Sequence, residues 1–180
     1  MSTDRFVRSA RAEDVEAVVG VQVAAWAAVY GDRLPAGALA EMTGAEARER
    51  FAAQWRAAVE HPPSSRHRVL VATEERAVAG FAAVAPAGDP DLWPGTDAEI
   101  LALHVLPDRA RRGHGSRLLN AVVDHLVDDG FRTAVVWVAE SDDPLRPFLE
   151  ATGWRADGAR RELDLGRPLP MVRLHAAIAG

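Results

Sequence analysis

The sequence contains no cysteine and no lysine, since all 21 of its basic residues are arginine. Without cysteine there are no disulfide bonds, thiol nucleophiles, iron–sulfur clusters or zinc sites built on thiolates. Without lysine there is no Schiff base, no anchor for pyridoxal phosphate and no Walker A loop. A covalent acyl intermediate on either side chain is therefore excluded.

Long apolar segments and an excess of positive charge are also missing. The longest apolar run, residues 17–31, contains Gln22 and falls short of the roughly 20 residues that cross a bilayer. The first ten residues lack the apolar centre of a signal peptide. We therefore expect a cytoplasmic protein with no membrane partner. A net charge of -5 argues against a nucleic-acid partner, because such proteins present a basic face to phosphates.

The chain length suits one hydrophobic core, and we expect residues 1–180 to form a single domain. Apolar patterns predict strands over residues 5–10, 68–73, 77–85, 98–106, 133–139, 160–165 and 169–175. They predict helices over residues 12–30, 113–129 and 144–152, and a further helix that ends near Glu60 after a capping box at Thr43, Gly44, Ala45 and Glu46. A short turn is expected near Leu39. This order predicts an α/β (α+β) fold with a mixed sheet and helices on its faces.

Residues 103–119 place four arginines and two glycines between an apolar strand and an apolar helix. The first N–H groups of a helix have no intrahelical partner, and the helix dipole adds partial positive charge there. Gly113 and Gly115 lack side chains, so an anion can approach the amides, and Ser116 adds a hydroxyl. Within this segment only Asp108 offsets the arginines. The turn therefore predicts a phosphate-binding site.

A dinucleotide-binding turn is the main alternative among nucleotide sites, and it would bind NAD or ATP. The third glycine of that fingerprint is missing, because Leu118 stands in its place. The glycines also follow the strand by six or more residues instead of directly. Both departures disfavour this alternative.

The turn resembles the acetyl-CoA motif of the GNAT superfamily of N-acetyltransferases, in which a strand L-x-V-x-P precedes Gln/Arg-x-x-Gly-x-Gly/Ala and a helix. Residues 103–107 match the strand and residues 111–116 match the turn, whereas Ala110 stands at the Gln/Arg position. Residues 21–35 are similar to the first-helix segment that borders the acceptor pocket in many members. Residues 147–154 resemble the later motif FYE-x-x-GF. The resemblance thus extends over nearly the whole chain.

This resemblance implies a mostly antiparallel central sheet flanked by helices on both faces, with acetyl-CoA as acyl donor. The acceptor would be a primary amine of a small molecule or peptide. With no cysteine or lysine to carry the acyl group, transfer should be direct, within a ternary complex. Paired protomers are common in the superfamily, which leaves a homodimer open. The donor-binding residues implied are Leu103, His104, Val105, Arg111, Arg112, Gly113, His114, Gly115 and Ser116.

Acetyl transfer needs a base, because an alkyl amine with a pKa of about 10 is protonated at neutral pH. The candidate is Glu99, a position at which the resemblance also implies a base. Strand alternation places it on the face of Leu101, Leu103 and Val105, where apolar surroundings would raise its affinity for a proton. The alternatives are an exposed carboxylate at the strand end and Asp97 as the base.

The resemblance assigns support of the oxyanion to the backbone N–H of Val105. The side chain of His104 would share the opposite face of this strand with Ile100, Ala102 and Leu106. We expect it to be packed or solvated and not catalytic. His114 is expected to contribute its amide.

Trp26 and Tyr30 lie on successive turns of one predicted helix face, where they would reach the acceptor pocket or pack in the core. Leu149 stands where many members carry the tyrosine that protonates the leaving thiolate. This loss predicts a slower enzyme or, as the alternative, a catalytically silent acyl-CoA-binding module. The histidine spacings contain no HExxH or paired ligands, so we expect no metal.

Overall fold

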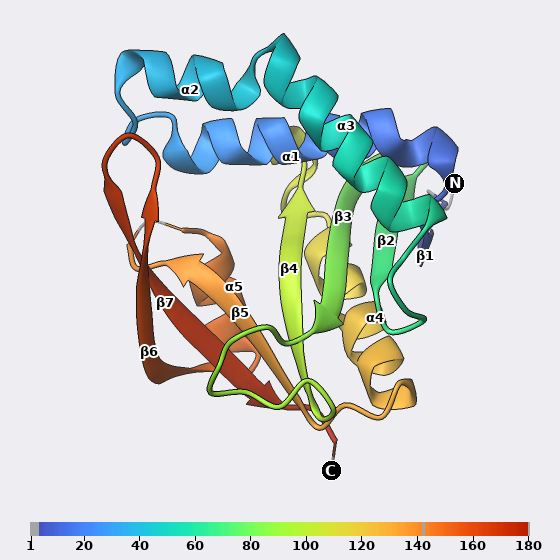
Figure 1. The fold of residues 1–180 in the computed structure, drawn as a ribbon. Helices are drawn as coiled ribbons and strands as arrows, with labels where there is room; N and C mark the ends of the chain where they lie inside the picture. Colours follow the sequence, from blue (N-terminus) through green and yellow to red (C-terminus); the bar gives the residue numbers. More distant parts are fainter. Residues whose placement is uncertain (1–3, 142, 180) are drawn as a thin grey trace.

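A seven-stranded sheet with the order β1-β2-β3-β4-β5-β7-β6 runs through a computed structural model that describes residues 4–141 and 143–179 (Figure 1). Every neighbouring pair is antiparallel except β4 and β5, which are parallel. The strands are β1 (Arg5–Ser9), β2 (Arg68–Glu74), β3 (Ala77–Pro86), β4 (Asp97–Val105), β5 (Thr133–Ala139), β6 (Arg155–Asp164) and β7 (Pro168–Ala177). The mixed, mostly antiparallel sheet is confirmed.

Helices cover both faces of the sheet, as expected. On one face, α1 and α3 pack over β2, β3 and β4, and α4 packs on the other face of the same strands, with α5 beside β5 (Figure 1). The helices are α1 (Val15–Tyr30), α2 (Ala36–Thr43), α3 (Ala45–Glu60), α4 (His114–Asp128) and α5 (Leu145–Ala151). None of the described helices combines the length and the apolar content that a bilayer crossing requires.

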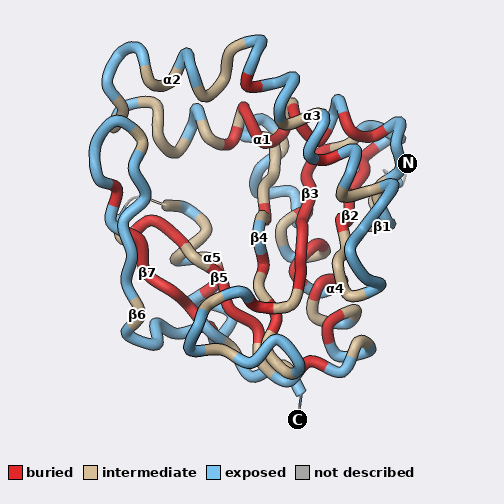
Figure 2. Tube along the Cα trace, viewed as in Figure 1, coloured by how far each residue is buried: buried red, intermediate tan, exposed pale blue. Residues whose placement is uncertain are grey.

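The sheet separates two apolar cores, and Figure 2 shows β2, β3 and β5 as mostly buried strands. One core lies under α4 and includes Ile100 and Leu103. The other lies under α1 and α3, where Ala102 packs against Phe81 and its neighbours.

The segment between α1 and α3 differs from the prediction. Residues near Leu39 form the two-turn helix α2 and not a simple turn. This helix buries none of its residues and begins after Pro35 without a side-chain cap, so its sequence carries little helical signal. The expected capping box is wrong, because the Thr43 hydroxyl donates to the Leu39 carbonyl at 2.7 Å and Gly44 is the residue that precedes α3.

An irregularity in β4 changes which side chains share a face. Ala83 of β3 pairs with Ala102 of β4, and the next residue, Val84, pairs with Ile100. Leu101 is therefore left without a partner on β3. Such a bulge reverses the alternation of side chains. Ile100 and Leu103 therefore both face α4.

The prediction that Glu99 shares the face of Leu103 and Val105 is therefore wrong. Glu99 lies on the opposite face from Ile100, since the two residues are adjacent before the bulge. It shares that face with Ala102 and His104. His104 and Ile100 lie on opposite faces, which also differs from the prediction.

Candidate active site

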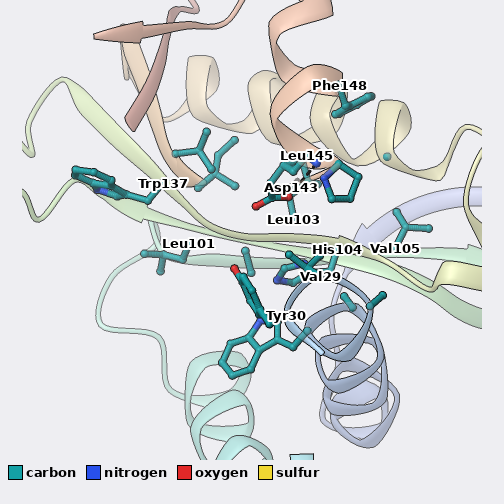
Figure 3. Close-up of a pocket in the computed structure, with 18 of the residues that line it drawn as sticks. Val29, Tyr30, Leu101, Leu103, His104, Val105, Trp137, Asp143, Leu145 and Phe148 are labelled. Carbon is teal, nitrogen blue, oxygen red and sulfur yellow. Dashed lines mark hydrogen bonds between the residues drawn. The ribbon is translucent and has the colours of Figure 1, made fainter. Parts of the chain in front are cut away.

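A cleft opens where β4 and β5 separate. The two strands pair only between Asp97–Ile100 and Thr133–Val136, and beyond these residues they diverge (Figure 1). The cleft has a volume of about 870 Å³. Side chains from α1, β4 and the segment around α5 converge on it (Figure 3). Among the predicted site residues, those that line it are Trp26, Tyr30, Glu99, Leu103, His104, Val105, Arg111, Gly113, His114, Gly115 and Ser116.

The turn between β4 and α4 leaves a run of backbone amides unpaired. None of the N–H groups from residue 111 to residue 116 has a hydrogen-bond partner in the described part of the chain. The first bond of the helix runs from the N–H of Arg117 to the carbonyl of Gly113 at 3.1 Å. Arg111 and Gly113 adopt φ angles of 64° and 84°, a conformation that glycine tolerates far better than arginine. The turn is therefore shaped to present N–H donors to an anion.

Gly115 is the glycine whose missing side chain matters most for access to these amides. A Cβ atom built there would contact Phe148 at 3.7 Å and Val105 at 4.0 Å, and both residues line the cleft. Alanine would therefore fit the fold, but its methyl group would occupy part of the cleft.

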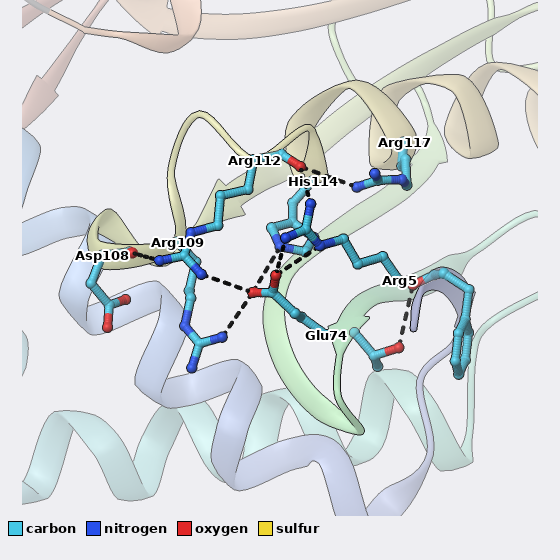
Figure 4. A network of polar contacts seen from close by, with 9 residues as sticks. Arg5, Glu74, Asp108, Arg109, Arg112, His114 and Arg117 are labelled. Atoms are coloured by element: carbon cyan, nitrogen blue, oxygen red, sulfur yellow. Dashed lines mark hydrogen bonds and ion pairs between the residues drawn. The ribbon is translucent and has the colours of Figure 1, made fainter. Parts of the chain in front are cut away.

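Glu74, at the end of β2, anchors the turn from below (Figure 4). Its side chain is only 3% exposed and accepts from Arg5 at 2.6 Å and Arg109 at 2.8 Å. Arg112 lies 3.4 Å from the same carboxylate. These contacts, led by the hydrogen bond from Arg109, lower the pKa of Glu74 to about 2. Glu74 therefore offsets the arginines of the turn, contrary to the expectation that only Asp108 does so.

Arg112 and His114 belong to this Glu74 cluster. The Arg112 side chain turns to Glu74 and does not line the cleft, although its neighbour Arg111 does. The His114 ring is buried, with Nε2 3.5 Å from Glu74. Burial lowers the pKa of His114, and the nearby carboxylate only partly opposes this effect. His114 is therefore neutral and packs under the turn.

Glu99 lies in the cleft on the side of β4 that faces α1. Burial is the main cause that raises its pKa, and the charge of Asp89 acts in the same direction. The expected rise in proton affinity is thus confirmed, although the residue lies on the other face. The alternative base, Asp97, is engaged elsewhere, because its carboxylate accepts from the Trp93 N–H at 2.8 Å.

Sequence comparison decides the family of this chain, since residues 26–154 match the model of the acetyltransferase (GNAT) family. The chain belongs to the GNAT family. The uncharacterized N-acetyltransferase YuaI of Bacillus subtilis strain 168 is 31% identical over 137 residues, which are 76% of this chain and 72% of that protein. Family membership confirms the expected class of enzyme and acetyl-CoA as its acyl donor.

Solved structures share the GNAT fold over nearly the whole chain. PaiA N-acetyltransferase from Thermoplasma acidophilum, in complex with coenzyme A, superposes with a TM-score of 0.74 at 17% identity, covering 98% of this chain and 99% of that one. YncA from Salmonella typhimurium, with its cofactor acetyl-CoA, gives 0.66 at 18% identity, covering 97% and 94%. These likenesses confirm the expected fold.

A second charged cluster lies beside Trp137, which lines the cleft. Arg173 of β7 is 5% exposed and pairs with Asp89 at 2.8 Å, Asp91 at 2.5 Å and Asp157 at 2.7 Å. The Trp137 indole N–H donates to Asp89 at 3.0 Å. This Arg173 cluster could not be predicted from the sequence, because the loop that holds Asp89 and Asp91 lies 84 and 82 positions from Arg173.

The structure places the three remaining aromatic and apolar residues that the sequence singled out. Tyr30 lines the cleft, where burial and the charge of Asp143 raise its pKa to about 12. Trp26 also lines the cleft and packs edge-on against Phe51, with ring centroids 5.3 Å apart. Leu149 is fully buried in the core under α4.

No three histidine, aspartate or glutamate side chains within residues 4–141 and 143–179 are grouped so that they could hold a metal ion.

Proposed function

We propose that this GNAT enzyme transfers the acetyl group of acetyl-CoA directly to a primary amine of a small molecule or peptide, with residues 1–180 acting as one catalytic domain. The proposal rests mainly on the part of β4 that follows Ile100, which no longer pairs with β5. There its free edge lies between the unpaired amides of the turn and the carboxylate of Glu99, in one continuous cleft.

The amides of residues 111–116 would bind the diphosphate of the acyl donor. Six unpaired N–H groups at a helix start, beside the positively charged Arg111, match the charge and the acceptor oxygens of that group. Leu103 and His104 line the cleft farther along β4, where the pantetheine arm would extend.

Val105 would support the oxyanion. The N–H of Leu106 bonds to the Ala79 carbonyl of β3 at 2.8 Å. Because successive N–H groups of a strand point to opposite edges, the N–H of Val105 points away from β3 and toward the opening between β4 and β5. A donor held there can stabilise the charge that develops on the thioester oxygen.

Glu99 would accept the proton that the amine must lose, directly or through water. The neutral amine then attacks the thioester carbon and a C–N bond forms. The nitrogen loses its second proton to water, and the C–S bond breaks to release the thiolate. The raised pKa of Glu99 makes it a better base than an exposed glutamate, because it holds the proton more strongly.

No general acid stands at the position of the usual tyrosine, because Leu149 is a core residue here. The thiolate would therefore leave without being protonated by that residue. General acid catalysis contributes roughly 10²- to 10⁴-fold. A thiol with a pKa of about 8.5 nevertheless leaves as the anion and takes its proton from water. We therefore expect a slow but active enzyme.

Replacing Glu99 tests the proposal. We expect Glu99→Gln to lower kcat/KM by about 10²- to 10⁴-fold in an assay of released thiol, while calorimetry shows unchanged binding of coenzyme A. In the wild type, kcat/KM should rise with pH through a pKa above the ordinary value of 4.5. Glu162→Gln, on the exposed face of β6, is the matched control and should change neither.

Initial rates at varied concentrations of both substrates test direct transfer. A ternary complex gives intersecting double-reciprocal lines, whereas a covalent acyl-enzyme gives parallel ones. Parallel lines, or tight binding of acetyl-CoA without turnover of any amine, would contradict the proposed function.

A further inference from the structure

Arg161 lies on β6 at the acceptor end of the cleft. Its guanidinium carbon lies 4.3 Å from the centre of the Trp137 ring, and both residues line the cleft. No carboxylate of residues 4–141 or 143–179 lies within 4 Å of this guanidinium. Its neighbour Arg160, by contrast, pairs with Glu140. Arg161 is thus a positive charge available to a ligand.

A chain of contacts fixes the platform on which Arg161 rests. The Trp137 indole donates to Asp89, and Asp89 pairs with the buried Arg173. Arg173 is held in turn by Asp157 of β6 itself. Stacking on an aromatic ring leaves the N–H groups at the edge of a guanidinium free to bind a carboxylate. The arrangement therefore presents those N–H groups in a defined orientation.

Glu99 is the opposite charge at this end of the cleft. It pairs with Val135 of β5, and Trp137 lies two residues farther along β5, so Glu99 and the ring that carries Arg161 share one face of the sheet. The charge of Arg161 also acts on Glu99. The remaining charged residues of the lining are committed elsewhere. The Asp143 carboxylate accepts from the N–H groups of Ala139 at 3.2 Å and Leu145 at 3.0 Å, and Arg111 belongs to the donor turn.

Apolar side chains line much of the same cleft. They come from α1, α2, the bulge of β4, the end of β6 and the residue that follows β6, and they are Trp26, Val29, Met42, Leu101, Leu163 and Leu165. A ligand that matches this end of the cleft has one amine, one anionic group and an apolar body.

We propose that the acceptor is an amino acid or a similar primary amine that carries a carboxylate and an apolar body. Its carboxylate binds Arg161 and its amine lies at Glu99. This inference rests on the proposed acetyl transfer. An amine without the carboxylate would leave the Arg161 charge without a counterpart, so Arg161 determines specificity.

Matched acceptors that differ only at the carboxylate test this inference. The pairs are leucine with leucinamide, phenylalanine with phenylalaninamide, and 6-aminohexanoate with 6-aminohexanamide. The amine lies next to the carboxylate in the first two acids and at the far end of the chain in the third. For at least one pair we expect the ratio of kcat/KM, acid over amide, to fall by about tenfold to a hundredfold in Arg161→Gln. The acid and the amide differ in the basicity of their amines. This difference cancels when the acid-over-amide ratio of the wild type is compared with that of Arg161→Gln.

Two further variants separate binding of the carboxylate from a structural effect. Arg160→Gln, on the same strand, should leave the ratio unchanged. Arg161→Lys should recover part of it, because lysine restores the charge but not the planar pair of donors. The loss in Arg161→Gln should appear in KM for the acid, with KM for acetyl-CoA unchanged.

The outcomes distinguish this inference from the proposed function. A ratio in every pair that is unchanged by Arg161→Gln, while amines are acetylated, overturns the inference and leaves acetyl transfer standing. Binding of acetyl-CoA without acetylation of any amine overturns both.

Discussion

The two charged clusters beside the cleft have opposite compositions. Glu74 is a buried carboxylate in contact with three arginines, which leaves two positive charges uncompensated next to the turn. Arg173 is a buried guanidinium in contact with three aspartates, which leaves two negative charges uncompensated near the acceptor end. Each cluster touches a residue that lines the cleft, His114 in the first and Trp137 in the second.

This difference matches the two substrates that we propose. A diphosphate is an anion and suits the positive surroundings of Glu74. The ammonium group of the proposed acceptor suits the negative surroundings of Arg173, while Arg161 provides the positive charge for the acceptor's carboxylate. Charge distributions of this kind raise the local concentration of their ligands before any contact forms. The two halves of the cleft are thus distinguished by charge as well as by shape.

The clusters also differ in what they support. The arginines around Glu74 are 30–46% exposed and hold a loop, whereas Arg173 joins two strands and the segment between β3 and β4. We therefore expect disruption of the Arg173 cluster to affect mainly folding, and disruption of the Glu74 cluster to affect mainly binding of the acyl donor.

Arg173→Met should have the largest effect. Removal of one partner from a buried ion pair typically costs about 3–5 kcal/mol. Here the loss falls on Asp89 and Asp157, whose side chains are 20% and 18% exposed, because Asp91 is largely open to solvent. We expect a loss of that size in the free energy of unfolding, measured by urea denaturation. Arg155→Met, at an exposed position of β6, is the control. Equal losses in the two variants would contradict the structural role of Arg173.

Glu74→Gln should have a smaller effect, directed at the donor. Without the carboxylate, three arginines repel one another and the turn loses its anchor. We expect coenzyme A to bind about tenfold more weakly by calorimetry, with partial recovery at higher salt because salt screens the repulsion. Glu75→Gln, at the adjacent exposed position, should bind normally. Tighter binding by Glu74→Gln would show that its added positive charge matters more than the order of the turn.

The pH dependence of stability should show the smallest effect. The pKa of Glu74 is about 2 in the folded protein and near 4.5 when unperturbed, so its ionised form stabilises the fold. That contribution is complete above pH 4.5 and disappears as the pH falls toward 2. The difference in unfolding free energy between the wild type and Glu74→Gln should therefore shrink over this range. A constant difference would contradict the ion pairing.

Local patterns were sufficient to predict most of the sheet, the helices α1, α3, α4 and α5, and the donor turn. The strands have clear apolar runs. Gly113 and Gly115 lie between an apolar strand and an apolar helix, which indicates a helix start. These features depend on residues that are close together in the chain. Most residues predicted for the site line the cleft, since many of them belong to one continuous segment, residues 103–116.

Features that depend on distant residues could not be predicted in this way. Glu74 reaches Arg109 across 35 positions, and Arg173 reaches Asp89 across 84. The bulge at Leu101 is set by the pairing of β4 with β3, and it reverses the face on which Glu99 lies. The helix α2 has only eight residues and buries none of them, so its pattern is close to that of a loop.

Binding of coenzyme A to the amides of the turn is the central claim, and amide chemical shifts test it most directly. On titration of the folded, isotope-labelled protein with coenzyme A, the N–H signals of Gly113, His114, Gly115 and Ser116 should show the largest changes. Pantetheine, which lacks the diphosphate and the adenine nucleotide of coenzyme A, should leave them nearly unchanged. Unchanged signals at saturating coenzyme A, or changes confined to another part of the sheet, would contradict the account.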